Sequence, residues 1–192
     1  MASASEPAPP SEPSDEELVR AARAGEESAF ETLLLRHETR VTRVLVLLGL
    51  GAAEREDAAQ EVFLRVFRHL ASYRPGLPFG AWLYRIAVNV ARDFQRQRRR
   101  RSSESAWNPA AELLPDRSPG PAALAHQDED RRRLEAALAR LSPRERIAFV
   151  LCDLEELETA DVAQALGISA ITVRRHLSRA RDHLHRLLTG ND

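Results

Sequence analysis

Polar side chains that could hold an anion recur along the segment FGAWLYRIAVNVARDFQRQRRRR, residues 79–101. Steps of four, three and four residues place four of them on one side of an α-helix. These are Arg85, Asn89, Arg92 and Arg96. A guanidinium group binds phosphate bidentately, and a carboxamide can hydrogen-bond to a base. The sequence therefore predicts a helix that faces an anionic partner, either a membrane surface or a nucleic acid.

The opposite side of this expected helix is apolar and follows the rhythm of a packed helix face. Its members are Phe79, Trp82, Leu83, Ile86, Ala87, Val90, Ala91 and Phe94. An unbroken arginine run, from Arg98 to Arg101, ends the segment. One side is thus expected to pack into a core while the other stays available for the anion.

A second nucleic-acid signal lies in residues 158–184, ETADVAQALGISAITVRRHLSRARDHL. A helix, a tight turn at Gly167 and a second helix capped by Ser169 form the pattern of a helix-turn-helix, whose second helix enters the major groove. An Arg fork there can read guanine, and an aliphatic side chain can touch a thymine methyl. The expected DNA-facing residues are Ser169, Ile171, Thr172, Arg174, Arg175, Ser178 and Arg179. A three-helix packing unit with a solvated basic face is the alternative.

A third face is expected on a helix over residues 54–70. Its buried stripe is predicted to hold Val62, Phe63, Val66, Phe67 and Leu70. The other side carries acidic and amide groups and one apolar residue in polar company. These are Asp57, Gln60, Glu61 and Leu64, and Arg68 follows on the same side. From the residues alone, a solvated helix face is the alternative to a binding surface.

The helices that position these faces are bounded by clear start and stop signals. Ser14 with Glu17, and Ser142 with Pro143 and Glu145, are capping boxes. Helices are expected over 15–24, 27–48, 54–70, 79–101, 130–139, 143–152, 159–166 and 170–188. Because no strand pattern of note occurs, the predicted fold class is all-α, with two small helical domains joined by a flexible linker.

The expected domain boundaries follow the shifts in composition. Residues 1–13 hold four prolines and are expected to form a disordered tail, and residues 14–101 are expected to form the first domain. An acidic, proline-rich linker is expected over 102–129, and the second domain over 130–188. Residues 92–101 hold six Arg against one Asp, whereas residues 1–31 hold eight acids against two Arg. The net charge of −1 therefore conceals strong local separation.

Other chemistries find little support in the sequence. The single cysteine, Cys152, excludes an internal disulfide, and no Cys/His cluster has metal-ligand spacing. We therefore expect no catalytic residues, no metal and no cofactor. No apolar run approaches the roughly twenty residues of a membrane span, so a cytoplasmic protein without membrane insertion is expected.

With these segments in their observed order, the chain resembles an RNA polymerase sigma factor of the sigma-70 family, extracytoplasmic-function (ECF) type. The resemblance covers roughly residues 15–101 and 130–188. DAAQEVFLRVFRHL, residues 57–70, is similar to the family's polymerase-clamp helix. The segment from Phe79 resembles the promoter-melting helix, and LSPRERIAFVLCDLEELETADVAQALGISAITVRRHLSRAR resembles the reader of the upstream promoter element.

The resemblance implies roles for particular residues. Asp57, Gln60 and Glu61 match positions that bind the coiled coil of the largest (β′) polymerase subunit, with Leu64 adding apolar contact, and the β flap is a further implied partner. Asn89 matches a residue that contacts the displaced strand, beside phosphate contacts from Arg85, Arg92 and Arg96. In the loop 71–79, Tyr73 is expected to offer its ring to a flipped base. Glu158 stands where many members have a capping Ser or Thr, so Thr159 is an alternative cap.

The function implied is that of a promoter-specificity subunit. It would bind core RNA polymerase, recognise minus-ten and minus-thirty-five promoter elements, and start transcription of a stress-responsive or signal-responsive regulon under the control of an anti-sigma factor. Two alternatives remain. One is a stand-alone helix-turn-helix regulator. The other is an enzyme such as a cysteine hydrolase, which has only Cys152 and scattered histidines in its favour.

Overall fold

The computed structural model describes residues 12–104 and 132–189, and every regular element within these ranges is helical. The expectations about residues 1–11 and about the linker beyond Glu104 lie outside the described residues. The elements are α1 (Asp15–Arg23), α2 (Glu27–Leu47), α3 (Ala52–His69), η1 (Leu70–Ser72), α4 (Phe79–Glu104), α6 (Pro143–Phe149), the π-helical turn η2 (Val150–Leu154), α7 (Thr159–Leu166) and α8 (Ala170–Thr189). Residues 132–139 are also helical.

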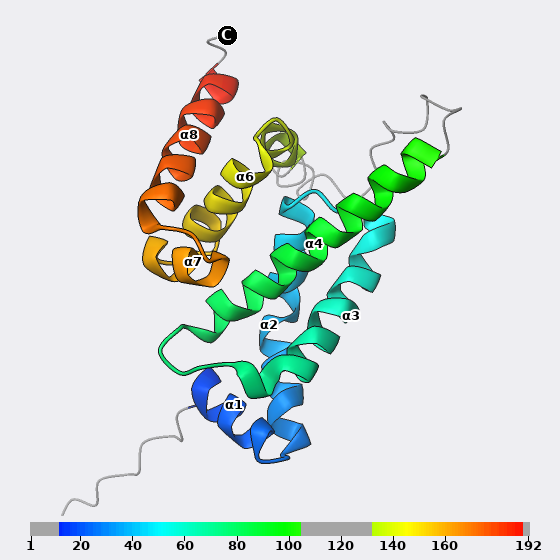
Figure 1. Cartoon of the computed structure of the whole chain (residues 1–192), viewed down its shortest axis with the longest axis vertical. Coiled ribbons are helices and arrows are strands. Elements are labelled where there is room, and N and C mark those ends of the chain that lie inside the picture. Colours follow the sequence, from blue (N-terminus) through cyan, green and yellow to red (C-terminus); the bar gives the residue numbers. More distant parts are fainter. Residues whose placement is uncertain (1–11, 105–131, 190–192) are drawn as a thin grey trace, which may run out of the picture.

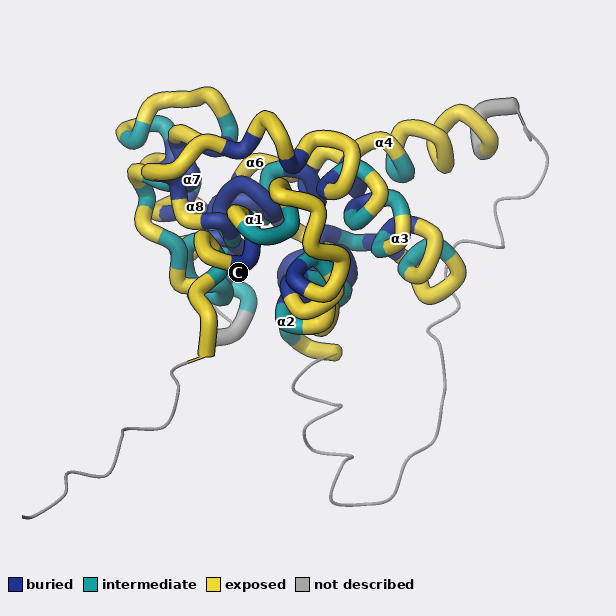
Figure 2. Tube along the Cα trace, turned by 90° about the horizontal axis from the view of Figure 1, so that it is seen from below, coloured by how far each residue is buried: buried dark blue, intermediate teal, exposed yellow. Residues whose placement is uncertain are grey.

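Three long helices, α2, α3 and α4, pack against one another in the first domain, with α1 at one end (Figure 1). Burying an aliphatic side chain contributes about 1.5–3 kcal/mol relative to leaving it exposed. The fully buried side chains of this bundle include Val41, Leu45, Val62 and Leu83. The C-terminal part of α4 projects beyond the bundle and is exposed (Figure 2). The apolar stripes thus fix the first half of α4 and leave its arginine-rich end in solvent.

Helix α1 is fixed to α2 by polar contacts. Ser14 and Glu17 form the predicted capping box at its start. Asp15 lies with one carboxylate oxygen 2.8 Å from His37 Nε2 and the other 2.7 Å from Arg36 Nη1. The hydrogen bond with His37, followed by that from Arg36, lowers the pKa of Asp15. Asp15 therefore accepts these bonds as a carboxylate at neutral pH.

The second domain is a smaller set of helices around α8. Its predicted inward stripe is confirmed where side chains are described, because four members are no more than 6% exposed. These are Val173, Leu177, Ala180 and Leu184; Leu188 falls outside the described side chains. The helix predicted over 143–152 is α-helical only to Phe149 and then widens into η2. In the described part of the chain, no helix is long and apolar enough to cross a bilayer.

A capping box at Ser142 starts α6 as predicted. The Glu145 amide donates to Ser142 Oγ at 3.4 Å, and the Ser142 amide donates to Glu145 Oε2 at 3.1 Å. Glu145 is 7% exposed. Burial raises the pKa of its carboxyl, but the hydrogen bonds from Ser142 outweigh this effect, so the pKa is lowered overall. The cap therefore gives hydrogen-bond partners to backbone amides at a partly buried helix start.

Ser142→Ala should destabilise the protein by about 1 kcal/mol, because an amide of the first turn and the Glu145 carboxylate both lose a partner. Urea unfolding followed by circular dichroism measures the change. Ser142→Thr, which keeps the hydroxyl, is the matched control and should unfold close to wild type. An equal loss for alanine and threonine would show that packing around position 142, rather than the cap, sets the effect.

The two domains pack together, and their buried residues form one apolar core. Helix α7 lies against α4 (Figure 1). On α4, Tyr84 and Val88 are 2% and 0% exposed, although the predicted stripe contains neither. The stripe was incomplete for a physical reason. A helical rhythm shows the side that faces its own domain, whereas Tyr84 bonds to the second domain and Val88 lines a cavity with Leu141 and Ile147.

Candidate nucleic-acid interface

The predicted polar row of α4 lies on the surface of the bundle. Asn89, Arg92 and Arg96 are exposed and Arg85 is half-buried, while Leu83, Ala87 and Val90 on the packed side are fully buried. Arg96 pairs with Asp93, three residues before it in α4, at 3.7 Å, a contact weakened by solvent at this exposed site. The buried side of α4 therefore fixes the helix to the bundle while the polar row remains at the surface.

The helix-turn-helix forms as predicted. Gly167 adopts φ 67°, the left-handed conformation that a side chain disfavours, so the chain turns sharply after α7. Ser169 caps α8, because its Oγ accepts the Thr172 amide at 3.1 Å. The suggestion that Thr159 caps α7 is wrong. Glu158 is the capping residue, and its side chain makes no cap hydrogen bond.

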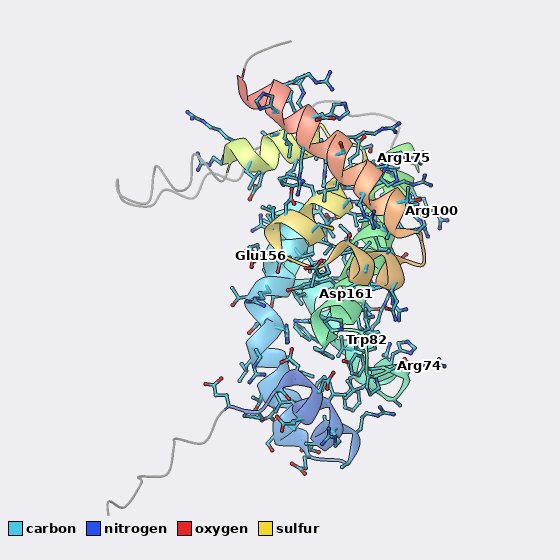
Figure 3. All side chains as sticks on the ribbon, turned by 90° about the vertical axis from the view of Figure 1, so that its left-hand side faces the viewer. Arg74, Trp82, Arg100, Glu156, Asp161 and Arg175 are labelled. Carbon is cyan, nitrogen blue, oxygen red and sulfur yellow. The ribbon has the colours of Figure 1, made fainter. Side chains whose placement is uncertain are left out.

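The outer face of α8 is open to a partner. Ile171 is 74% exposed, and Ser169, Arg174, Ser178 and Arg179 are also exposed. Arg175 projects from the same helix, away from the core (Figure 3). Thr172 is half-buried. The face thus presents three guanidinium groups and one large aliphatic side chain on a helix fixed by buried residues on its other side.

The two predicted DNA faces meet across the domain boundary. A cavity of about 290 Å³ is lined by Arg92 of α4, by Arg144 of α6 and by Thr172 and His176 of α8. Burial, and then the charges of Arg175 and Arg144, lower the pKa of His176, which shows the positive field at this point. Sequence reasoning did not place Arg144 here, because only the packing of α6 on α8 brings it beside Thr172, and it did not assign His176 of α8 to this face.

The predicted third face lies on the outer side of α3. Asp57 and Gln60 are exposed, Leu64 is 48% exposed, and Glu61 is half-buried. Arg65 donates to Glu61 at 2.6 Å and to Asp93 of α4 at 2.9 Å. Arg65 thereby connects this face of α3 to the polar row of α4.

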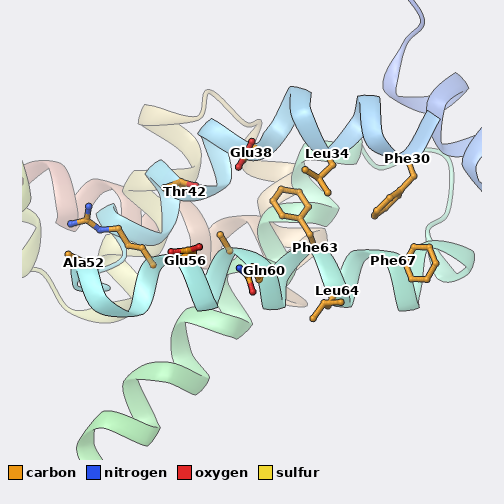
Figure 4. A pocket seen from close by; sticks show the side chains of 12 residues that line it. Phe30, Leu34, Glu38, Thr42, Ala52, Glu56, Gln60, Phe63, Leu64 and Phe67 are labelled. Atoms are coloured by element: carbon orange, nitrogen blue, oxygen red, sulfur yellow. The ribbon is translucent and has the colours of Figure 1, made fainter. Parts of the chain in front are cut away.

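Beside this face, α2 and α3 enclose an apolar groove of about 680 Å³ (Figure 4). Phe30 and Leu34 of α2 face Phe63 and Phe67 of α3 across it. The assignment of Phe67 to the buried stripe is wrong, because the side chain is 66% exposed and packs only edge-on against Phe30, with ring centroids 5.3 Å apart. Gln60 and Leu64 line the groove as well, so it belongs to the third face.

The structure corrects the expectation for Tyr73. Its side chain is 3% exposed, and its hydroxyl donates to the Leu77 carbonyl at 2.7 Å within the loop. The ring packs edge-on against Phe79 and Trp82, with centroids 5.6 Å apart in both pairs. Tyr73 is therefore a core residue that folds the loop onto the bundle, and it offers no free ring face to a base.

Cys152 lies half-buried in η2. Burial raises the pKa of its thiol to about 11, so the reactive thiolate is scarce at neutral pH. Among residues 12–104 and 132–189, no three His, Cys, Asp or Glu side chains gather as a metal site would require.

Both halves of the chain match known domain families in order. The model described as Sigma-70 region 2 matches residues 33–101, and the model described as Sigma-70, region 4 matches residues 131–184. The ECF RNA polymerase sigma factor SigE of Mycolicibacterium smegmatis is 36% identical over 178 residues, which cover 90% of this chain and 68% of SigE. SigM of Mycobacterium tuberculosis is 34% identical over 179 residues, covering 92% of this chain and 86% of SigM.

Solved structures show the same architecture. CnrH in complex with the cytosolic domain of CnrY superposes with a TM-score of 0.70 at 25% identity, over 93% of this chain and 99% of CnrH. RpoE from Bartonella quintana, in complex with the anti-sigma factor NepR, superposes with a TM-score of 0.65 at 25% identity, over 85% of this chain and 98% of RpoE. The domain order, the helical fold and relatives of this identity together show that the chain belongs to the sigma-70 family of RNA polymerase sigma factors, in its ECF group.

Proposed function

We propose that this protein is a promoter-specificity subunit that binds core RNA polymerase and recognises minus-ten and minus-thirty-five promoter elements to start transcription of a signal-responsive regulon. The observation that carries the proposal is the pairing of two exposed polar faces in one chain. One is the row from Arg85 to Arg96 on α4, and the other is the outer face of α8. A third, mixed apolar and acidic face on α3 supplies a surface for the enzyme.

The α8 face suits readout of duplex DNA. Its exposed guanidinium groups at Arg174, Arg175 and Arg179 can reach guanine edges and phosphates when the helix enters a major groove. Ile171 at the tip, 74% exposed, suits a thymine methyl. This half is proposed to read the minus-thirty-five element, with Arg144 and His176 as flanking contacts.

The α4 face suits strand separation. Asn89 presents a carboxamide that can pair with an unstacked base. Arg92 and Arg96, on the next two turns of the same face, can hold the phosphates. Because the helix is buried on its other side, it can act as a rigid edge. This half is proposed to recognise and open the minus-ten element.

Control by an anti-sigma factor is part of the proposal. A second groove of about 740 Å³ joins the domains, with Val46 and Leu47 on one side and Leu134 and Leu154 on the other, and it shares residues of α2 and α3 with the groove at Phe67. A partner helix along both grooves would hold both domains at once. Photo-crosslinkers placed at Phe67 and at Leu134 should then trap the same protein from uninduced cells and release it on induction; two different adducts would contradict this.

Reconstituted transcription tests the function directly. The purified chain is added to core polymerase on genomic DNA fragments, and transcript starts are mapped. Defined starts that need both components support the proposal. Tight, sequence-specific DNA binding without polymerase, together with no directed start, would instead identify a stand-alone helix-turn-helix regulator.

Replacing Arg175 with alanine is expected to relax upstream base preference. Loss of a bidentate contact to guanine costs about 1–3 kcal/mol of discrimination at one base pair. Competition between promoter duplexes that differ at single upstream positions measures the change. Arg186→Ala, at an exposed arginine near the end of α8, is the matched control and should leave base preference unchanged. A uniform loss across sequences with a shallower salt slope would make Arg175 a phosphate contact.

A further inference from the structure

A buried carboxylate lies at the centre of the contact between the two domains. Glu155, directly after η2, has a side chain only 2% exposed. Its Oε1 accepts bonds from Arg43 at 2.7 and 3.1 Å, and its Oε2 accepts the Tyr84 hydroxyl at 2.8 Å. Arg43 belongs to α2 and Tyr84 to α4. Both oxygens of a second-domain carboxylate are therefore held by the first domain.

These contacts are directional and hard to replace. Tyr84 is 2% exposed, and burial, followed by the bond to Glu155, raises the pKa of its hydroxyl, so it stays a donor. A buried carboxylate that loses its partners keeps the cost of desolvation without compensation. A second polar contact across the domains runs from Arg146 Nη1 to the Leu48 carbonyl at 3.4 Å. Packing of the domains therefore depends on specific bonds as well as on apolar contact.

The packed arrangement brings the two DNA faces too close together for a promoter. Arg92 of the α4 face and Thr172 of the α8 face line one cavity of about 290 Å³. Elements centred ten and thirty-five base pairs upstream lie about 85 Å apart in B-form DNA, at 3.4 Å per base pair. Both faces cannot reach their elements in this arrangement. A chain of 27 residues, the number from 105 to 131, spans at most about 97 Å at 3.6 Å per residue, so the covalent chain permits the domains to separate.

We propose that the packed arrangement is a closed state unable to bind a promoter, and that Glu155 is the latch that holds it through Arg43 and Tyr84. Separation of the domains breaks the latch and frees Arg92 and Thr172 together. The inference rests on the proposed DNA-reading function of the two faces. It is supported by RpoE from Bartonella quintana, which superposes over both domains and was solved with an anti-sigma factor bound, so a similar arrangement occurs in a sequestered sigma factor.

The test first places two positive charges together at the latch and then restores an oppositely charged pair. Glu155→Arg places two guanidinium groups together, and the double variant Arg43→Glu with Glu155→Arg reverses the pair. Glu156→Arg, a change of the same charge at the exposed neighbouring residue, is the matched control (Figure 3). Tyr84→Phe removes only the hydroxyl and keeps the ring, so it tests the latch with the least disturbance of packing.

Two readouts are taken on the full chain without polymerase. Small-angle scattering should show a larger radius of gyration for Glu155→Arg. The second readout is the affinity for a promoter duplex that contains both elements and was identified in the reconstituted transcription assay. This affinity should rise about tenfold, because a larger fraction of the protein has its domains separated and can bind DNA. The double variant should return both values toward wild type, the control should leave them unchanged, and Tyr84→Phe should move both in the direction of Glu155→Arg.

Two results would overturn the latch. An unchanged radius in both Glu155→Arg and Tyr84→Phe, with native helix content, means that Glu155 does not hold the domains together. A larger radius with unchanged affinity means that the closed state does not prevent promoter binding. If Glu155→Arg loses its helical signal, Tyr84→Phe decides alone. Failure of the wild-type chain to direct transcription with core polymerase would instead count against the proposed function.

Discussion

Leu64→Arg is expected to weaken binding to core RNA polymerase by about 100-fold while leaving the fold intact. Leu64 is 48% exposed at the rim of the groove between α2 and α3, between acidic and amide side chains of the same face. An unpaired charge buried at the centre of an interface costs about 3 kcal/mol, which corresponds to a loss of roughly two orders of magnitude in affinity. Fluorescence anisotropy of labelled protein titrated with core polymerase gives the dissociation constant.

Helix α2 offers a matched control for this substitution. Leu35 is 69% exposed and does not line the groove, so Leu35→Arg introduces the same charge on an exposed leucine of the same domain. Its dissociation constant should stay within about twofold of wild type, as for surface substitutions away from an interface. Equal losses for both variants would mean that added positive charge, rather than the α3 face, weakens the complex.

The helices and several of their ends could be predicted because the signals for these are local. The capping boxes at Ser14 and Ser142, the cap at Ser169 and the left-handed turn at Gly167 each depend on residues within a few positions. The exposed rows on α4 and α8 could be predicted as well, because a helix that buries one stripe of side chains exposes the opposite side to solvent. Asn89 and Arg175 therefore lie on the surface as predicted, while their roles remain predictions.

Tertiary contacts explain what the sequence could not show. Tyr73 looked available because its loop is rich in turn residues, yet its hydroxyl finds the Leu77 carbonyl and its ring joins Phe79 and Trp82. Phe67 kept the helical rhythm of the buried stripe but lies where α2 and α3 leave a groove. Periodicity gives the direction of a side chain and not the presence of a neighbour to cover it.

The contact between the domains was beyond any local pattern. Glu155 and Tyr84 are 71 residues apart in the chain, and Glu155 and Arg43 are 112 apart. A glutamate in a turn normally remains in solvent, and nothing in its neighbours predicts burial. The same holds for Arg144 of α6, which reaches the cavity beside Thr172 only through the packing of α6 on α8. A functional site whose residues come from two domains therefore cannot be predicted from local sequence patterns and has to be found in the structure.

Asn89→Ala is expected to slow promoter opening by about tenfold and to change closed-complex affinity little. The exposed carboxamide lies on the α4 row between Arg85 and Arg92, where it can contact a base only after the base leaves the stack. Removing a base contact of about 1–3 kcal/mol that forms only in the open complex raises the opening barrier and leaves the preceding duplex contacts in place. The fluorescence of 2-aminopurine in the minus-ten element gives the opening rate, and gel shift at low temperature gives closed binding.

Gln97→Ala separates a base contact from a general effect of losing an amide on α4. Gln97 is exposed on the same helix but is not a member of the row; it lines a cavity with Asp57, Glu61 and Arg96. Its opening rate should match wild type. If Asn89→Ala weakens closed binding as much as it slows opening, Asn89 contacts the duplex before strand separation, and the melting role passes to other residues of the row. A selective effect on opening, absent in Gln97→Ala, assigns strand capture to Asn89, because only a contact absent from the closed complex can divide the two steps in this way.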